Sequence, residues 1–149
     1  MESRENKNPF NIFAEAEFTV EFFDIDPMKV VWHGNYFNYF EIGRRTLLEK
    51  INYSYYEMEK SGYAFPVIES SIKYLGALMY RDRARVRSIL LEYENRLRIR
   101  YEIHNMETGI LTTRGLSTQM AYDIRAKESC FVCPRVLIEK VEALIGESP

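Results

Sequence analysis

The sequence predicts an α+β fold in which one long central helix is wrapped by a curved antiparallel sheet. A strand pattern near the N-terminus is followed at once by a single long, aromatic-rich helix pattern. Several long strand patterns joined by short turns then occupy most of residues 65–123, and an amphipathic helix pattern follows them. Consecutive strands joined as hairpins pair antiparallel, so the sheet should be mainly antiparallel.

The length and charge of the chain limit its class. Its 149 residues fit one domain, which we expect over residues 12–149 after a flexible polar segment at residues 1–11. The formal net charge of -2 creates no overall field that would favour nucleic acid or an anionic membrane as a partner. No apolar run approaches the ~20 residues of a membrane span, and the first residues lack the apolar stretch of a secretory signal. We therefore expect a cytoplasmic protein.

The first strand is expected over residues 12–23. Phe18, Val20 and Phe22 alternate there with polar residues, which is the period-two pattern of a half-buried strand. Pro27 should end the strand, because proline cannot donate a backbone hydrogen bond and biases the preceding residue away from helical angles.

The central helix is expected from Tyr36 to about residue 51, with Asn35 as its N-cap. Its apolar stripe consists of Tyr36, Phe40, Leu47 and Ile51, widened by Phe37 and Leu48. Gly43 lies on the same stripe. A glycine inside a helix costs about 1 kcal/mol relative to alanine, so we expect Gly43 to permit a close approach to the sheet.

The remaining elements are predicted from alternation and from turn residues. They are a short helical turn within 52–62, strands at 65–75, 83–95, 97–103 and 110–123, and a final helix that begins at Pro134 and ends at Gly146. Pro66 suggests that the 65–75 strand lies at an edge or begins there, because proline cannot complete a strand ladder. Residues 105–109 should form the turn between two long strands.

Cys130 and Cys133 form a C-x-x-C pair. A structural zinc site needs four ligands, and the only two histidines, His33 and His104, are far away in the sequence. A redox pair would normally lie at an early junction between a strand and a helix. We interpret the two thiols as incidental.

The segment 24–45 carries the motif D-x-D-P-x-x-V-V-W-H-G-N-Y-x-x-Y-F-E. This motif resembles the signature of hotdog-fold thioesterases of the 4-hydroxybenzoyl-CoA thioesterase type and of related small bacterial acyl-CoA and acyl-carrier-protein thioesterases. The likeness covers residues 15–140. It implies a hotdog fold, a homodimer that is often paired into a homotetramer, and active sites at the dimer interface.

The resemblance also implies roles for individual residues. Asp26 matches the catalytic aspartate, which acts as a nucleophile or as a general base for water. His33 matches the position whose backbone N–H polarises the thioester carbonyl, and a histidine there is implicated in activity in several relatives. Two positions depart from the family pattern: Lys29 stands where a glycine is usual, and Ala77 where a proline is common. The lysine could alter the loop conformation and the pocket entrance.

The residues themselves can be interpreted in the same way. Thioester hydrolysis needs a nucleophile or base, donors for the oxyanion and a slot for the acyl chain. Asp26 can supply the first, and the free N–H groups at the start of the Tyr36 helix, with its positive dipole end, can supply the second. Gly34 would let a carbonyl come close to the backbone. No metal or organic cofactor is required.

Structural roles compete with these catalytic ones. An aspartate before a proline is usually a turn former, and Asp24, two residues from Asp26, is expected to be structural. His33 could equally be a side-chain base or a residue that packs and forms hydrogen bonds. Glu41 is a second candidate carboxylate, because some hotdog enzymes of other lineages carry theirs on the central helix.

The simpler role for Glu41 is an ion pair with Arg44 or Arg45 across one helical turn. The residues that could line a substrate pocket are Trp32, Asn35, Tyr36, Tyr39 and Glu41. The simpler role of Trp32, Tyr36 and Tyr39 is in the core, and that of Asn35 is as the helix cap. The residues that could meet the phosphates of CoA or of a carrier-protein arm are Lys73, Arg81, Arg83 and Arg85. Solvated strand charges are the simpler interpretation of that basic group.

The sequence thus favours an acyl thioesterase that acts on a CoA or acyl-carrier-protein thioester, with a slight preference for the carrier protein as donor. The alternative is a noncatalytic hotdog acyl-binding or assembly protein, for which Lys29 is the warning sign. A hotdog dehydratase is a third option, but the proline of its usual H-x-x-x-P-G-like motif is missing after His33. The sequence leaves the acyl chain open.

Overall fold

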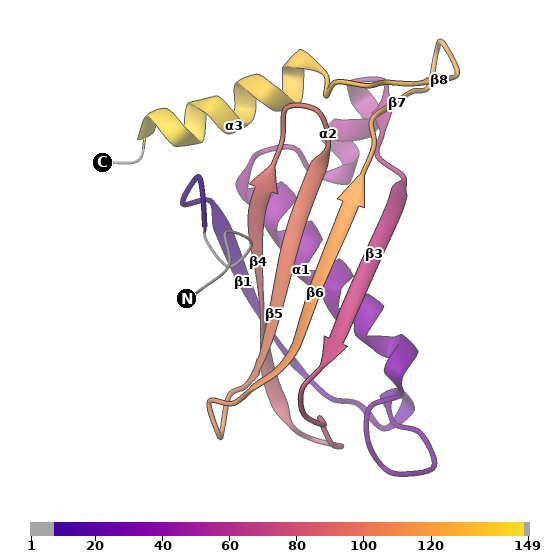
Figure 1. Cartoon of the computed structure of the whole chain (residues 1–149), viewed down its shortest axis with the longest axis vertical. Helices are drawn as coiled ribbons and strands as arrows, with labels where there is room; N and C mark the ends of the chain where they lie inside the picture. Colours follow the sequence, from indigo (N-terminus) through magenta and orange to yellow (C-terminus); the bar gives the residue numbers. More distant parts are fainter. Residues whose placement is uncertain (1–7, 148–149) are drawn as a thin grey trace.

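The computed structural model describes residues 8–147. Its strands and helices follow the predicted order (Figure 1), and they are β1 (Phe13–Thr19), α1 (Tyr36–Lys50), α2 (Tyr55–Lys60), β2 (Tyr63–Ala64), β3 (Val67–Tyr74), β4 (Arg83–Glu92), β5 (Leu97–Asn105), β6 (Leu111–Gln119), β7 (Tyr122–Asp123), β8 (Glu128–Ser129) and α3 (Arg135–Glu147). Two short 3-10 turns, η2 (Phe22–Asp24) and η3 (His33–Asn35), lie between β1 and α1.

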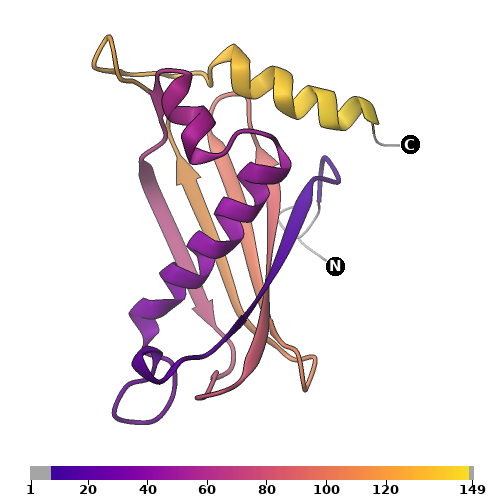
Figure 2. The same ribbon diagram turned by 180° about the vertical axis from the view of Figure 1, so that it is seen from behind.

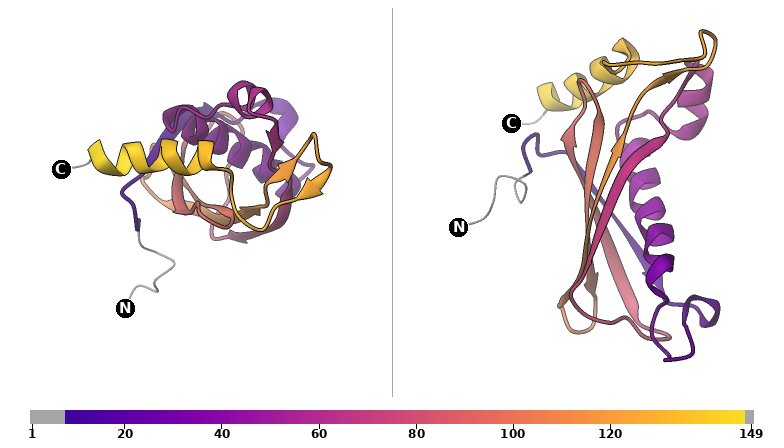
Figure 3. Two further views of the ribbon diagram at one scale, coloured as in Figure 1. Left: turned by 90° about the horizontal axis from the view of Figure 1, so that it is seen from above. Right: turned by 45° about the vertical axis from the view of Figure 1, so that its right-hand side comes forward.

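The main sheet has five strands in the order β1-β4-β5-β6-β3, and every pair of neighbours is antiparallel. The helix α1 runs along one face of this sheet (Figure 2), and the sheet curves around it (Figure 3). A second, small sheet has the order β2-β7-β8, and α3 lies across the adjacent end of the molecule. The predicted α+β fold, with a central helix wrapped by an antiparallel sheet, is confirmed.

The approach of α1 to the sheet depends on Gly43. A Cβ atom built on this glycine would lie 2.9 Å from Cγ2 of Val86 and 3.5 Å from Cβ of Ser88, both on β4. The hydroxyl of Ser88 also donates a hydrogen bond of 2.7 Å to the carbonyl oxygen of Gly43. The structure confirms that this glycine permits close packing of the helix on the sheet.

Around this contact the core is filled by apolar side chains from the helix and from the inner face of the sheet. Its largest side chains, each almost inaccessible to solvent, are Tyr53, Tyr101, Leu47, Leu48, Ile51, Leu78, Leu90, Leu97, Ile99, Ile103 and Leu137. The rings of Phe40 and Tyr101 stack in parallel with their centroids 4.6 Å apart. Burial of this apolar surface is the main favourable contribution to folding.

The first strand is shorter than predicted. Phe22 and Phe23 lie outside β1 and are 71% and 84% exposed, so the prediction that residues 12–23 form one strand was wrong at its end. The cause is local: the carboxylate of Asp24 accepts a hydrogen bond of 2.9 Å from the backbone N–H of Glu21. That bond winds the chain into the turn η2, and alternation of apolar residues does not reveal it.

Three other predicted boundaries were wrong. The strand predicted over residues 83–95 ends at Glu92. Residues 110–123 form β6 and β7, which belong to different sheets, because the chain leaves the main sheet after Gln119. The N–H of Met120 donates instead to the carbonyl of Pro66, at 3.2 Å. Gly146 does not end the last helix, since α3 extends to Glu147.

The strand β3 forms one edge of the main sheet, as Pro66 suggested, and within residues 8–147 it pairs only with β6. Nearly all its side chains are exposed, including those of Val67, Ile68 and Tyr74. An exposed apolar edge strand carries unpaired backbone groups and is suited to pairing with another chain.

At the N-terminus, only residues 8–11 of the predicted flexible segment 1–11 lie among the described residues. There the ring of Phe10 packs edge-on against Tyr93, with the centroids 5.1 Å apart. None of the helices within residues 8–147 has the length and apolar character needed to cross a bilayer.

Candidate functional site

The motif around Asp26 folds into a closed loop beside the start of α1 (Figure 1). The N–H of Asp26 donates to the carbonyl of Val30 at 2.8 Å, and Ile25 and Val31 form an antiparallel bridge at the base of the loop. A second bridge joins Val30 to Met79, just before β4. The loop is thus attached both to itself and to the sheet.

Asp26 is half-buried at the start of this loop. Its Oδ1 accepts a hydrogen bond of 2.8 Å from the N–H of Met28, so the side chain does form a turn. A carboxylate has about four acceptor positions on two oxygens, and this bond occupies one of them. Among residues 8–147, no basic side chain forms an ion pair with it. The carboxylate therefore retains acceptor capacity for a water molecule or a substrate.

The backbone conformation of Lys29 explains why the family motif usually has glycine at this position. Its φ angle is 67°, in the left-handed region, and its N–H donates to the carbonyl of Asp26 at 2.9 Å. A residue with a Cβ is strained there by roughly 1–2 kcal/mol, whereas glycine is not. The loop closes with lysine at this position at the expense of backbone strain.

Asp24 is buried and serves as an anchor. Its Oδ2 accepts hydrogen bonds from the N–H of Glu21, at 2.9 Å, and from the hydroxyl of Tyr39 on α1, at 3.0 Å. Burial, reinforced by the Asp24 carboxylate, raises the pKa of Tyr39 above its ordinary value. The carbonyl of Asp24 also accepts from the N–H of Trp32 at 2.9 Å. These contacts join η2, the loop and the helix, and they support a structural role for Asp24.

The start of the helical run differs from the prediction at Asn35. This residue has helical backbone angles and its side chain makes no cap hydrogen bond, because η3 leads directly into α1. Its Oδ1 accepts instead from Nδ2 of Asn38 at 2.5 Å. The helical run therefore begins at His33. The first N–H groups of such a run, those of His33 and Gly34, have no partner within it.

The ring of Trp32 lies over this turn. A Cβ atom at Gly34 would come within 2.5 Å of the indole, so glycine is required if the ring is to stay where it is. Trp32 remains 52% exposed. Its ring centroid is 5.2 Å from that of His33, whose side chain is also exposed.

A cavity of about 300 Å³ opens beside the turn. Its lining consists of Val30, Val31, His33, Tyr36, Tyr74, Leu75, Gly76 and Ala77. Of the predicted pocket and catalytic residues, His33 and Tyr36 line it. The others, Asp26, Trp32, Gly34, Asn35, Tyr39 and Glu41, do not. Asp26 is therefore not part of the cavity wall, although its backbone N–H donates to the carbonyl of Val30, which lines the cavity.

Tyr36 and Tyr74 form the aromatic wall of the cavity. Their rings meet edge to face, with centroids 5.2 Å apart. Burial raises the pKa of Tyr36. The hydroxyl of Tyr74 donates a hydrogen bond of 2.8 Å to the carbonyl oxygen of His33. Sequence reasoning missed Tyr74 because it comes from the distant strand β3, where alternation alone did not separate it from other strand residues.

Glu41 forms an ion pair with Arg44 and accepts a hydrogen bond of 3.1 Å from the hydroxyl of Tyr55. Nε of the largely buried Arg44 donates to the same hydroxyl at 3.1 Å. These contacts support the ion-pair role for Glu41. Arg45, the other predicted partner, is exposed.

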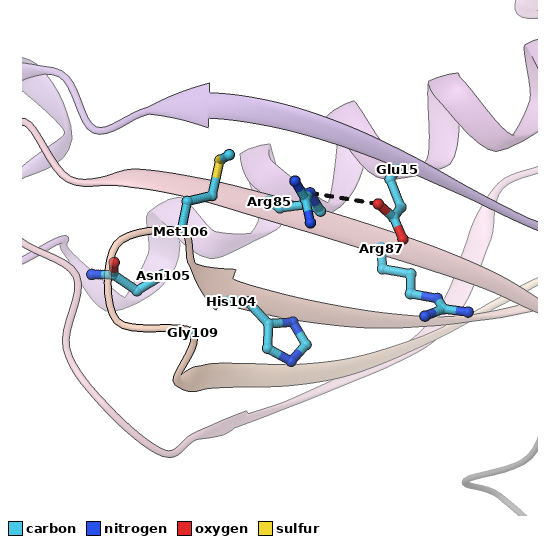
Figure 4. Close-up of a pocket in the computed structure, with 7 residues that line it drawn as sticks. All are labelled: Glu15, Arg85, Arg87, His104, Asn105, Met106 and Gly109. Atoms are coloured by element: carbon cyan, nitrogen blue, oxygen red, sulfur yellow. Dashed lines mark ion pairs between the residues drawn. The ribbon is translucent and has the colours of Figure 1, made fainter.

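The four residues of the predicted basic group differ in whether they form ion pairs. Arg83 and Arg85 each contact Glu17, at 3.4 Å and 3.3 Å, and Arg85 also contacts Glu15 at 3.5 Å. Figure 4 shows the Arg85–Glu15 pair in a second cavity, of about 310 Å³, on the side of the sheet away from α1. These contacts support the interpretation of both arginines as strand charges.

Lys73 and Arg81 differ from those arginines. Lys73 lies opposite Arg114 in the β3–β6 ladder, and the guanidinium of Arg81 lies 5.2 Å from the ring centroid of Tyr80. Neither forms an ion pair within residues 8–147. They are the members of the basic group that are best able to meet a phosphate.

Cys130 and Cys133 are both free thiols. Cys133 is buried, and burial raises the pKa of its thiol to about 12. A thiol with a raised pKa is a poor nucleophile and a poor redox group. Within residues 8–147, no three His, Cys, Asp or Glu side chains are grouped so that they could hold a metal ion.

Known proteins resemble the chain in sequence and in structure. A family model described as the thioesterase-like superfamily matches residues 20–140. The chain is 30% identical over 111 residues to YneP of Bacillus subtilis strain 168, whose suggested activity is that of an acyl-CoA thioesterase. That match covers 74% of this chain and 80% of YneP.

Two solved structures extend the comparison. The DHNA-CoA thioesterase of Staphylococcus aureus is 28% identical, with a TM-score of 0.78 over 91% of this chain and 94% of that protein. An Asp-to-Asn variant of 4-hydroxybenzoyl-CoA thioesterase, complexed with 4-hydroxybenzoyl-CoA, is 16% identical, with a TM-score of 0.76 over 87% of this chain and 99% of that one. The second likeness concerns the fold alone. Together these neighbours confirm the predicted hotdog fold.

Proposed function

We propose that Asp26 and the N–H groups at the start of η3 carry out thioester hydrolysis in this protein. The premise is that the chain belongs to the thioesterase-like superfamily and is a thioester hydrolase. The observation that carries the proposal is their common origin in one closed loop. The loop carries the Asp26 carboxylate, which has spare acceptor capacity. A few residues after the loop, the N–H groups of His33 and Gly34 have no partners within their turn. A base or nucleophile and an oxyanion site are the two groups that acyl transfer requires.

In the general-base form of the reaction, the Asp26 carboxylate accepts a proton from water as the water oxygen bonds to the thioester carbon. The carbonyl π electrons move onto oxygen, and the N–H groups of His33 and Gly34 stabilise this oxyanion. The oxyanion then reforms the carbonyl as the carbon–sulfur bond breaks. The thiolate leaves with the electron pair of that bond and takes up a proton.

In the nucleophilic form, a carboxylate oxygen of Asp26 attacks the same carbon and expels the thiolate, which leaves an acyl–Asp26 anhydride. Water then hydrolyses the anhydride and restores the carboxylate. Both forms yield a free acid and a thiol, and both place the oxyanion at the same donors. The imidazole of His33, exposed on the cavity wall, is available in either form to assist proton transfer.

For the thiol part of the substrate, we propose CoA or an acyl-carrier protein. The named activities of YneP and of the Staphylococcus aureus enzyme support an acyl-CoA. Lys73 and Arg81, without ion pairs in the described part of the chain, are our candidates for the phosphates of either donor, and Arg83 is a weaker one because Glu17 already neutralises it. We also propose a cytoplasmic location for the protein.

We also propose that the protein works as a homodimer, alone or paired into a homotetramer. The unpaired apolar edge of β3 is the surface that supports this. Two copies of β3 could pair through their free backbone groups and cover Val67 and Ile68. Tyr74 and Leu75, at the end of the same strand, line the cavity, so such an interface would lie next to the site.

The proposed activity is tested by following thiol release from a panel of thioesters. The panel contains benzoyl-CoA, acyl-CoAs from two to sixteen carbons, and the same acyl groups on acyl-carrier protein. Turnover of at least one member is expected, and the ratio of kcat/KM between matched CoA and carrier-protein substrates identifies the donor. No turnover of any member would instead support the noncatalytic acyl-binding alternative. Lys29, the motive for that alternative, does not prevent the loop from closing.

A further inference from the structure

The contact between Tyr74 and His33 joins two distant parts of the chain at the cavity. Tyr74 is the last residue of β3, 41 positions after His33, and its hydroxyl donates to the His33 carbonyl oxygen at 2.8 Å. The hydroxyl is the only group of β3 that forms a hydrogen bond to η3 within residues 8–147. It therefore fixes the turn to the edge of the sheet.

The carbonyl that Tyr74 contacts belongs to the same peptide group as the N–H of Gly34. A peptide group is planar and conjugated, so a fixed carbonyl oxygen also fixes the direction of the N–H on the opposite side. A hydrogen bond to the carbonyl withdraws electron density from nitrogen and makes the N–H a stronger donor, an effect of roughly 10–30% per bond in a chain of hydrogen bonds. The contact thus acts on the N–H that is proposed to bind the oxyanion.

Tyr74 is itself held in place. Its ring packs edge to face against Tyr36, which is only 3% exposed, and its backbone pairs with Thr113 in the β3–β6 ladder. The Tyr36 hydroxyl in turn interacts with the backbone of Leu78 and with the side chain of Thr113. The donor therefore sits on a packed aromatic pair, although half of Tyr74 is exposed to solvent.

We propose that Tyr74 is a positioning residue for thioester hydrolysis, which orients and polarises the His33–Gly34 peptide so that the Gly34 N–H binds the oxyanion. The inference rests on the proposed function of that N–H. The resulting series of hydrogen bonds runs from the Tyr74 hydroxyl through the His33 carbonyl and the Gly34 N–H to the carbonyl oxygen of the substrate. Tyr74 acts through the backbone and need not touch the reacting atoms.

Tyr74→Phe tests this, because it removes the hydroxyl and keeps the ring that packs on Tyr36. On the best substrate of the panel, we expect kcat to fall about tenfold with KM unchanged within twofold, since a donor is weakened rather than removed. Tyr56→Phe is the matched control: Tyr56 is 72% exposed on α2, at the opposite end of the molecule, and its loss of a hydroxyl should leave kcat unchanged.

A second readout reports on polarisation directly. The dethia analogues of benzoyl-CoA and octanoyl-CoA, in which a methylene replaces sulfur, keep the carbonyl and cannot be hydrolysed. With a ¹³C label, their carbonyl stretch should move to lower frequency on binding to the wild type and to Tyr56→Phe. In Tyr74→Phe this displacement should shrink by roughly 10–30%. The unfolding midpoint of each variant is measured as well. If the midpoint of Tyr74→Phe is unchanged, misfolding cannot be the cause of its smaller displacement.

The outcomes separate this inference from the proposed function. If Tyr74→Phe keeps the wild-type kcat and the full displacement, the positioning role is wrong while hydrolysis stands. If its KM rises while kcat and the displacement are unchanged, Tyr74 contacts substrate directly, and the proposed route through His33 is overturned. If the wild type neither hydrolyses the panel nor displaces the carbonyl stretch, the proposed function itself fails.

Discussion

The hydroxyl of Tyr39 on the central helix donates a 3.0 Å hydrogen bond to the buried carboxylate of Asp24, which in turn fixes the loop that carries Asp26. The ring of Tyr39 is stacked on Phe18 of β1, with centroids 4.0 Å apart. One side chain therefore joins the first strand, the helix and the loop. The loop geometry depends on a contact that has no part in the proposed chemistry.

Tyr39→Phe should lower the free energy of unfolding by about 1.5–2 kcal/mol, because it leaves a buried carboxylate with one donor fewer while the ring stays stacked. Urea unfolding measures the change. Tyr56→Phe, which removes an exposed hydroxyl, should change the stability by less than about 0.5 kcal/mol. Equal effects of the two variants would contradict the anchoring role of the Tyr39–Asp24 pair.

Stability should fall at high pH because of Tyr101. This residue is 1% exposed, and burial raises its pKa from 10.0 to about 12. An unfolded chain loses the phenolic proton near pH 10, whereas the folded protein retains it, so the unfolded state binds fewer protons above that pH. The contribution of Tyr101 is complete below pH 10 and should decline by roughly 2–3 kcal/mol as pH rises to about 12.

The check is urea unfolding at intervals from pH 9 to pH 12, for the wild type and for Tyr101→Phe. The variant loses the 2.8 Å hydrogen bond to Ser117 and is less stable throughout. Its stability should nevertheless decline less steeply above pH 10, because one titrating group is gone. Parallel curves for the two proteins would mean that Tyr101 does not titrate differently on unfolding.

Lys29→Gly should stabilise the protein by about 1 kcal/mol, because glycine adopts the left-handed angles of this position without a Cβ clash. Lys127, with a φ angle of 56°, provides a matched control away from the site, and Lys127→Gly should give a similar gain. Thermal unfolding compares the two. A destabilised Lys29→Gly beside a stabilised Lys127→Gly would show that the Lys29 side chain makes a contribution that outweighs its backbone strain.

The sequence predicted the features that depend on the spacing of apolar residues or on the intrinsic properties of a single residue, such as glycine or proline. Alternation located the long strands, and the glycine on the apolar stripe, Gly43, marked the point where the helix meets β4. Pro66 suggested an edge strand, and the helical spacing of Glu41 predicted an ion pair with Arg44 or Arg45, of which the structure shows the pair with Arg44. Each of these inferences uses information that lies within a few residues of the feature.

The errors arose where distant or competing contacts decide the structure. The carboxylate of Asp24 turned Phe22 out of the strand, and the turn η3 removed the capping role of Asn35. Tyr74 was missed because its partner, His33, lies 41 residues away. The ion pairs that divide the basic group could not be predicted, because Glu17 meets Arg83 and Arg85 only after β1 and β4 are in register. None of these contacts can be recognised from the spacing of apolar and polar residues in the sequence.

The central claim, that the Asp26 carboxylate drives hydrolysis, is tested most directly by Asp26→Asn. The amide oxygen of asparagine can still accept the 2.8 Å hydrogen bond from the Met28 N–H, so the turn should persist while the base or nucleophile is lost. The matched control is Asp123→Asn, since Asp123 on β7 accepts a comparable turn hydrogen bond of 3.0 Å from the Ala126 N–H.

The measurement is kcat/KM for thiol release from the best thioester, for the wild type and both variants, with urea unfolding to verify that all are folded. We expect Asp26→Asn to lose activity by about 10²- to 10⁴-fold and Asp123→Asn to remain within about twofold of the wild type. An Asp26→Asn protein that keeps at least about a tenth of the wild-type kcat/KM would contradict the assignment of Asp26 as the catalytic carboxylate.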